Sequence, residues 1–277
     1  MANGFDARLA EVLRAATENI RKAVAANFVP SPRVQLPTPV LEGLAKALAP
    51  LQPALERLDA MMPENWRGQR LDYRDMVRLM QEGVPLAWVP PADVIRQLLA
   101  VGETSSRSKV IDACRPEILD SCSVVLAKVV DARFSPQRAL LEECVQMIER
   151  GRFSGAQALA ANVWDTLVRG LAYANSTWLT DQGWWSYKKI IQSVPAVDDD
   201  DATIGQFRKA AVFLPFAKTL EEFRRPQPVP GDFNRHATAH ATGAVQYTAA
   251  NTVTALMLAV SVLREIDDQD YAVQLHA

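Results

Sequence analysis

Apolar side chains recur at intervals of three and four residues along most of this 277-residue chain, and no segment shows the strict alternation of a half-buried strand. That period places the apolar residues on one face of a helix. Proline and glycine interrupt the pattern where helices should end. The spacing predicts helices over residues 5–28, 71–82, 92–101, 107–130, 135–151, 202–223 and 248–266, with others opening at Thr38 and Ser154. We therefore expect an all-α fold.

The polar run ETSSRS (103–108) is predicted to be a loop and to separate two parts of the chain. Residues 1–105 would form a helical N-terminal region of unknown role, and residues 106–277 a second helical domain. Pro116 should bend or split the helix over 107–130. The apolar segment VPLAWVPP (84–91) is either an isolated strand or a buried connector, and the all-helical context favours the connector.

Charge is nearly balanced, with 30 basic and 32 acidic residues and a formal net charge of −2. This balance excludes a globally basic nucleic-acid-binding protein but is compatible with a locally basic cleft. The three cysteines include no CxxC pair, which indicates a reducing compartment. The start of the chain does not read as a signal peptide, and the apolar stretch 255–263 is too short to span a membrane. We expect a cytoplasmic protein with no membrane association.

Titratable groups suited to proton transfer near neutral pH gather in one hexapeptide. The chain has three histidines, and two of them, His236 and His240, lie one and five residues after Arg235 in the string RHATAH. An imidazole has an ordinary pKa of about 6.5, so it can take up and release protons. A guanidinium is a permanent forked cation that matches phosphate oxygens. These are the groups that RNA cleavage without metal requires.

Two geometric points qualify this interpretation. Residues five apart on an ideal helix point about 140° away from each other, so a straight helix would not aim Arg235 and His240 at one phosphate. A twofold dimer that brings two copies of the motif together would solve this problem. His236 and His240 share a helix face and could clip a metal, but Ala237 stands where a zincin has glutamate. We therefore expect neither a metal nor another cofactor.

The string FNRHATAH, with Tyr247, Thr248 and Asn251 after it, resembles the R-x4-6-H motif region of HEPN domains. The segment GRFSGAQALAANVWDTLV (151–168) also resembles a first core helix of such domains, and the resemblance covers roughly residues 107–270. One departure is Ala241, where relatives often carry glycine. The resemblance implies a HEPN-like helical bundle, a homodimer and a metal-independent endoribonuclease. It also implies a toxin–antitoxin or phage-defence setting, with an antitoxin or defence-system partner protein.

On this hypothesis Arg235 and His240 are the catalytic residues and RNA is the substrate. The predicted substrate-binding or supporting residues are His236, Asn234, Tyr247, Arg224 and Arg225. The alternative function is a non-catalytic HEPN-like module that binds nucleotide, RNA or a protein partner.

The sequence allows both a functional and a structural role for several other residues. Tyr247 and Asn251 would either support the site or cap the last helix. Trp178, Trp184 and Trp185 are expected to be core or interface anchors more often than base-stacking residues. The acidic run 198–201 is typical of a helix N-terminus.

Overall fold

The structure is a computed structural model that describes residues 59–69, 71–102, 104–192, 204–224 and 226–269. The chain divides between Pro53 and Ala54, and every described residue belongs to the second part. The helices predicted over 5–28 and from Thr38, the acidic run 198–201 and Arg225 lie outside the described residues.

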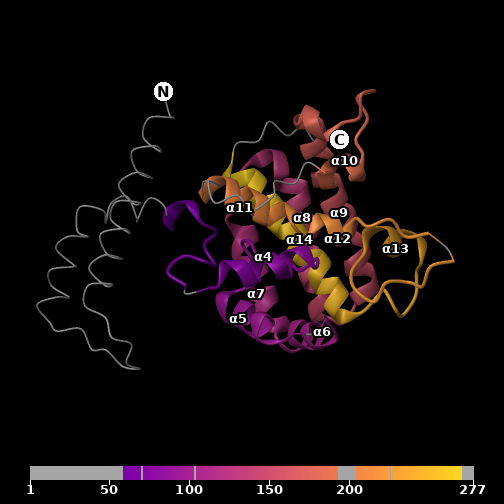
Figure 1. Cartoon of the computed structure of the whole chain (residues 1–277). Helices are drawn as coiled ribbons and strands as arrows, with labels where there is room; N and C mark the ends of the chain where they lie inside the picture. Colours follow the sequence, from indigo (N-terminus) through magenta and orange to yellow (C-terminus); the bar gives the residue numbers. More distant parts are fainter. Residues whose placement is uncertain (1–58, 70, 103, 193–203, 225, 270–277) are drawn as a thin grey trace, which may run out of the picture. The chain divides into compact units, whose positions relative to one another are not determined.

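The described part of the chain is helical, which confirms the predicted all-α fold (Figure 1). Its one β contact is an isolated bridge between Leu179 and Trp185. The longer helices are α4 (Tyr73–Gln81), α5 (Ala92–Ala100), α6 (Thr104–Ala113), α7 (Arg115–Ala127), α8 (Ser135–Glu149), α9 (Phe153–Ala174), α11 (Ile204–Phe213) and α14 (Ala249–Asp268). Shorter ones are η2 (Ala132–Phe134), η3 (Ser176–Trp178), α10 (Tyr187–Gln192), α12 (Phe216–Thr219) and α13 (Arg235–His240).

Helix α14 lies at the centre of the bundle, where α6, α7, α8 and α9 pack around it (Figure 1). Almost every residue of α14 from Ala250 to Leu263 is buried, which is the burial expected of a helix that is apolar on all sides. α14 is long and apolar enough to cross a membrane, but 89% of its apolar window is buried inside this bundle. Its hydropathy is therefore explained by its place in the core.

The start of the second helical region differs from the sequence prediction. Residues 103–108 were predicted to be a loop, but α6 begins at Thr104. Arg107 on this helix is buried and forms an ion pair with Glu82. The boundary predicted at residue 105 consequently falls in the first turn of α6, a helix that packs against α5.

Proline explains two other helix breaks. The helix predicted over 107–130 is split at Cys114, two residues before Pro116, into α6 and α7. The helix predicted over 202–223 is likewise divided into α11 and α12 at Pro215. The segment 84–91 is a buried connector, as the helical context favoured.

A buried polar cluster joins this connector to α11 and α14. The Trp88 indole nitrogen donates to Glu265 Oε2 at 3.0 Å, and Arg208 Nε donates to the same oxygen at 2.9 Å. Arg208 Nη2 lies 2.6 Å from Asp268 Oδ2. The side chains of Arg208 and Glu265 are only 5% and 2% exposed. Each buried charge is therefore paired, which is the condition for burying it at tolerable cost.

Candidate functional site

The RHATAH hexapeptide forms the short helix α13, and Asn234 caps it. The Asn234 side chain accepts a hydrogen bond from the backbone N–H of Ala237 at 2.8 Å and donates one to the carbonyl of Glu221 at 2.8 Å. Asn234 is 4% exposed. This predicted supporting residue thus acts on the start of the helix, in the manner usual for an N-cap asparagine.

Gln246 anchors the motif loop, although it is not among the predicted site residues. Its side-chain oxygen accepts from the backbone N–H of Asn234 at 2.9 Å, and its nitrogen donates to the carbonyls of Pro230 and Asp232 at 2.9 and 3.0 Å. The side chain is fully buried. A single glutamine in a loop has no recognisable sequence signal, so only the fold reveals this role.

Tyr247 and Asn251 also fix the loop backbone. The Tyr247 hydroxyl donates to the carbonyl of Thr238 in α13 at 2.7 Å. The Asn251 amide donates to the carbonyls of Gly231 at 2.9 Å and Gln246 at 2.8 Å. The cap of α14 is Thr248, whose hydroxyl accepts from the backbone N–H of Asn251 at 3.1 Å. Tyr247 and Asn251 were predicted either to support the site or to cap the last helix, and their contacts are those of residues that support the motif.

Arg235 reaches from α13 to α9. Its Nη2 donates to Asn162 Oδ1 at 3.1 Å and lies 3.4 Å from Asp165 Oδ2. Its Nη1 makes no hydrogen bond to any residue in the described part of the chain. Asp165 also pairs with Arg169 at 2.7 Å and accepts a hydrogen bond from the Tyr187 hydroxyl. One buried carboxylate therefore orients two guanidiniums, and burial together with its bond to Asp165 raises the pKa of Tyr187 to about 12.

The two histidines of α13 share a face of the helix, as their spacing predicted. Their ring centroids are 6.4 Å apart, and the His236 ring meets the edge of Tyr187 at 5.3 Å. His236 is half-buried, whereas His240 is exposed. Within the described residues no hydrogen bond or ion pair joins Arg235 to His240, in agreement with the divergence expected of residues five apart.

Burial gives His236 a testable property, because together with His240 and Arg235 it lowers the pKa of this histidine below 6.5 and outweighs the opposite effect of Glu222 and Asp165. We expect its NMR titration midpoint to fall below 6.5. The unfolded chain then binds a proton at His236 more readily than the folded chain does. His236 should therefore reduce the free energy of unfolding as the pH falls from 6.5 to the lower midpoint of the folded state. Above pH 6.5 it should have no such effect. Side-chain ¹⁵N spectra, with His236→Asn to assign the signal, measure this. A midpoint at or above 6.5 would contradict the burial argument.

The remaining predicted residues are scattered. Arg224 is exposed and pairs with Glu222 at 2.5 Å. Trp178 is 3% exposed and packs against Phe213, so it is a core residue as expected. Trp184 is 65% exposed, unlike a core residue. The described residues contain no group of three or more metal-ligating side chains.

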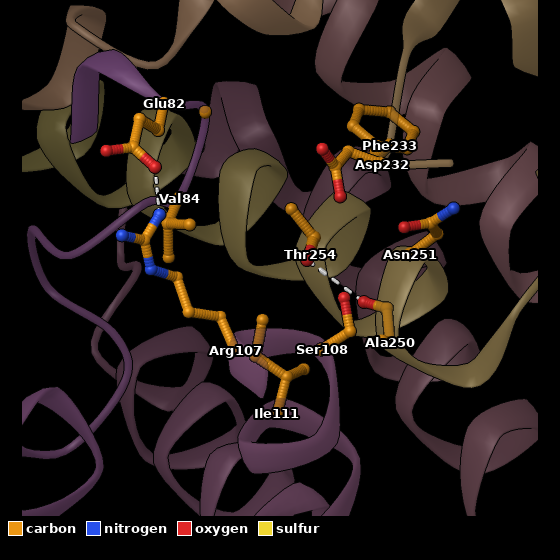
Figure 2. Close-up of a pocket in the computed structure, with 11 residues that line it drawn as sticks. Glu82, Val84, Arg107, Ser108, Ile111, Asp232, Phe233, Ala250, Asn251 and Thr254 are labelled. Carbon is orange, nitrogen blue, oxygen red and sulfur yellow. Dashed lines mark hydrogen bonds and ion pairs between the residues drawn. The ribbon is translucent and has the colours of Figure 1, made fainter. Parts of the chain in front are cut away.

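Among the described residues, two of the hollows lie beside the motif loop. An open hollow of about 560 Å³ follows α13 and is lined by Ser154, Gly155, Thr242, Gly243 and Tyr247. A cavity of about 30 Å³ lies behind the loop, with side chains of Asp232, Arg107, Glu82 and Thr254 at its wall (Figure 2). Burial raises the pKa of Asp232. The second cavity has room for little more than water, so only the open hollow has a size suited to a substrate.

Comparison with protein-family models, curated proteins and solved structures finds no match to this chain.

Proposed function

We propose that this chain is a metal-independent endoribonuclease with a HEPN-like helical bundle, acting in the cytoplasm in a toxin or phage-defence system. The observation that carries the proposal is the composition of one small surface. Two imidazoles lie on the same face of α13, and the neighbouring Arg235 makes its hydrogen bonds to described residues through Nη2, which leaves Nη1 without a partner among them. The open hollow beside the end of α13 offers space for a nucleotide.

The chemistry needs two proton transfers and one cation. A base removes the proton of a ribose 2′-hydroxyl, and the 2′-oxygen attacks the adjacent phosphorus. The bond from phosphorus to the 5′-oxygen breaks, and an acid returns a proton to that oxygen. In our proposal His240 takes the proton of the 2′-hydroxyl and, as the imidazolium so formed, returns it to the leaving 5′-oxygen, while Arg235 stabilises the charge on the phosphorane. His236, whose lowered pKa keeps it neutral near pH 7, orients the site or contacts phosphate.

The products provide a direct test. We expect the purified chain to cut an RNA oligonucleotide in the presence of EDTA and to leave a 2′,3′-cyclic phosphate and a 5′-hydroxyl, because both protons and the cation come from side chains. Mass spectrometry of the fragments identifies these ends. Activity that disappears on chelation and returns with zinc or magnesium would instead support a metal held by His236 and His240.

We further propose a homodimer whose two motifs form one cleft. The guanidinium of Arg235 bonds to α9 and, among the described residues, makes no hydrogen bond to His240, so Arg235 of one protomer and His240 of the other would converge on a phosphate.

A mixed dimer tests this arrangement. We expect a doubly tagged heterodimer of Arg235→Ala and His240→Ala to keep about half of the wild-type rate, because one of its two composite sites is intact. Each homodimeric variant is the matched inactive control. An inactive heterodimer would place both groups in the same protomer, and a monomer in light scattering at micromolar concentration would remove the dimer.

One observation favours the second candidate, a non-catalytic module that binds RNA, nucleotide or a protein such as an antitoxin. The side chains of Arg235 and Asp165 are 13% and 8% exposed, which is the arrangement of a structural ion pair. Such a module would bind RNA without cutting it, so the product assay separates the two functions.

A further inference from the structure

A second cation lies next to Arg235 and is shared with it through one carboxylate. Asp165 Oδ2 is 2.7 Å from Arg169 Nη2 and 3.4 Å from Arg235 Nη2. Two guanidiniums therefore face a single negative charge, which leaves an excess positive charge at this point of the surface. In the neighbouring segment Lys188 on α10 and Asp181 are exposed charges of opposite sign, and Glu222 adds a negative charge that acts on His236. An anionic chain that reached Arg235 would meet these cations next.

Arg169 stacks on one aromatic ring, and two exposed rings lie near that ring in the chain or on the helix of Arg169. Its guanidinium carbon lies 4.0 Å from the centroid of the Trp185 ring. The next residue back, Trp184, is 65% exposed. Tyr173, one turn after Arg169 on the same face of α9, is 44% exposed. Exposed rings and cations are thus found next in sequence to, or one helical turn from, the residues that contact Arg169 and Asp165.

The turn that carries Trp184 is held by its own hydrogen bonds. The backbone N–H of Thr180 donates to the carbonyl of Trp184 at 2.7 Å, and the backbone N–H of Trp184 donates to the Thr180 hydroxyl at 3.2 Å. Gly183 has a φ of +78°, which favours glycine in this turn. The turn therefore presents the Trp184 ring to solvent from a fixed backbone, which lowers the entropy cost of stacking a ligand on it.

We propose that Tyr173, Arg169, Trp184 and Lys188 form a docking strip for unpaired nucleotides of single-stranded RNA. A base stacks on Trp184, and Arg169 and Lys188 contact the backbone phosphates that lead to Arg235. Exposed rings interleaved with cations bind single strands without sequence preference, since every base has a π-face. A duplex keeps its bases stacked on each other and cannot use the rings. The strip rests on the proposed function for its link to catalysis, but its binding is measurable without cleavage.

The experiment uses the full chain and a fluorescently labelled single-stranded DNA oligonucleotide, which has no 2′-hydroxyl and so cannot be cleaved by the proposed reaction. We expect anisotropy to report binding that unlabelled single strands compete away far better than duplex DNA does. Trp184→Ala should weaken binding by about 5- to 150-fold, the usual effect of losing one stacking ring. Trp184→Phe should restore most of the affinity. Val130→Ala, at another exposed apolar residue, is the matched control and should change nothing.

Each result bears on the strip separately from the nuclease. Absence of binding, or equal binding by wild type and Trp184→Ala, overturns the strip. That result is the one expected if the exposed rings serve to bind a protein partner. Binding that depends on Trp184 in a chain that cuts no RNA upholds the strip and overturns the nuclease. If the chain cuts RNA but Trp184→Ala does not change its affinity for single strands, the nuclease is upheld and the strip is overturned. Melting curves should coincide for all three variants, because the changed side chains are exposed.

Discussion

We expect His240→Ala to lower the single-turnover rate of RNA cleavage by about 10²- to 10⁴-fold, the usual contribution of a positioned general acid or base. Arg235→Lys should fall well below wild type but less far, because an ammonium keeps the charge and loses the fork that fits two phosphate oxygens. His236→Ala should be the mildest of the three if its task is to orient the site. Rapid-quench kinetics with saturating protein measure all three rates.

Melting temperatures of the same variants separate catalysis from folding. His240 is exposed and holds no described residue in place, so its removal should leave the melting curve unchanged. Arg235→Lys tests both catalysis and folding, because Arg235 contacts Asn162 and Asp165 on α9. A large fall in its melting temperature would make Arg235 a structural residue. Full activity in His240→Ala would end the ribonuclease assignment.

The largest loss of stability is expected for Glu265→Ala, at about 3–5 kcal/mol of the free energy of unfolding, the cost of breaking a buried ion pair from one side. The change leaves the Trp88 indole N–H without its acceptor and removes the more deeply buried of the two carboxylates that pair with Arg208, so that Asp268 alone remains. Both partners are deeply buried, so water cannot replace the lost contacts. Urea denaturation followed by circular dichroism measures the change.

Two comparisons sharpen this measurement. Glu142→Ala removes a surface carboxylate 3.6 Å from Arg138 and should cost less than about 1 kcal/mol. Glu265→Gln keeps an oxygen acceptor and loses the charge, so it should fall between the two. A loss for Glu265→Ala no greater than that for Glu142→Ala would show that the buried cluster contributes little to stability.

The sequence predicted the helices well where local signals agreed. The helix predicted over 71–82 matches α4, which ends at Gln81, and Gly83 follows it with a φ of +97°. The prediction failed at 103–108, because a polar run reads as a loop unless its charges are paired. Arg107 finds its partner in Glu82, 25 residues away. Pairing across that distance leaves no trace in a local pattern.

The candidate site shows the same division. The sequence identified α13 and its two histidines, because they are adjacent in the chain. It did not identify Asp165, Arg169 or Tyr187, which lie 48 to 70 residues before Arg235 and reach the site only through packing of α9 and α10. Apolar periodicity marked residues near Asp165 as helix core, and nothing in the pattern distinguished a buried carboxylate there. Long-range ion pairs of this kind require the fold.

The most direct measurement is incubation of total RNA with the purified chain in EDTA, wild type beside His240→Ala, with the fragments resolved on a gel and their ends sequenced. We predict discrete cleavage products ending in 2′,3′-cyclic phosphate with wild type, and intact RNA with His240→Ala. RNA left intact by wild type, or cut equally by both proteins, would contradict the account.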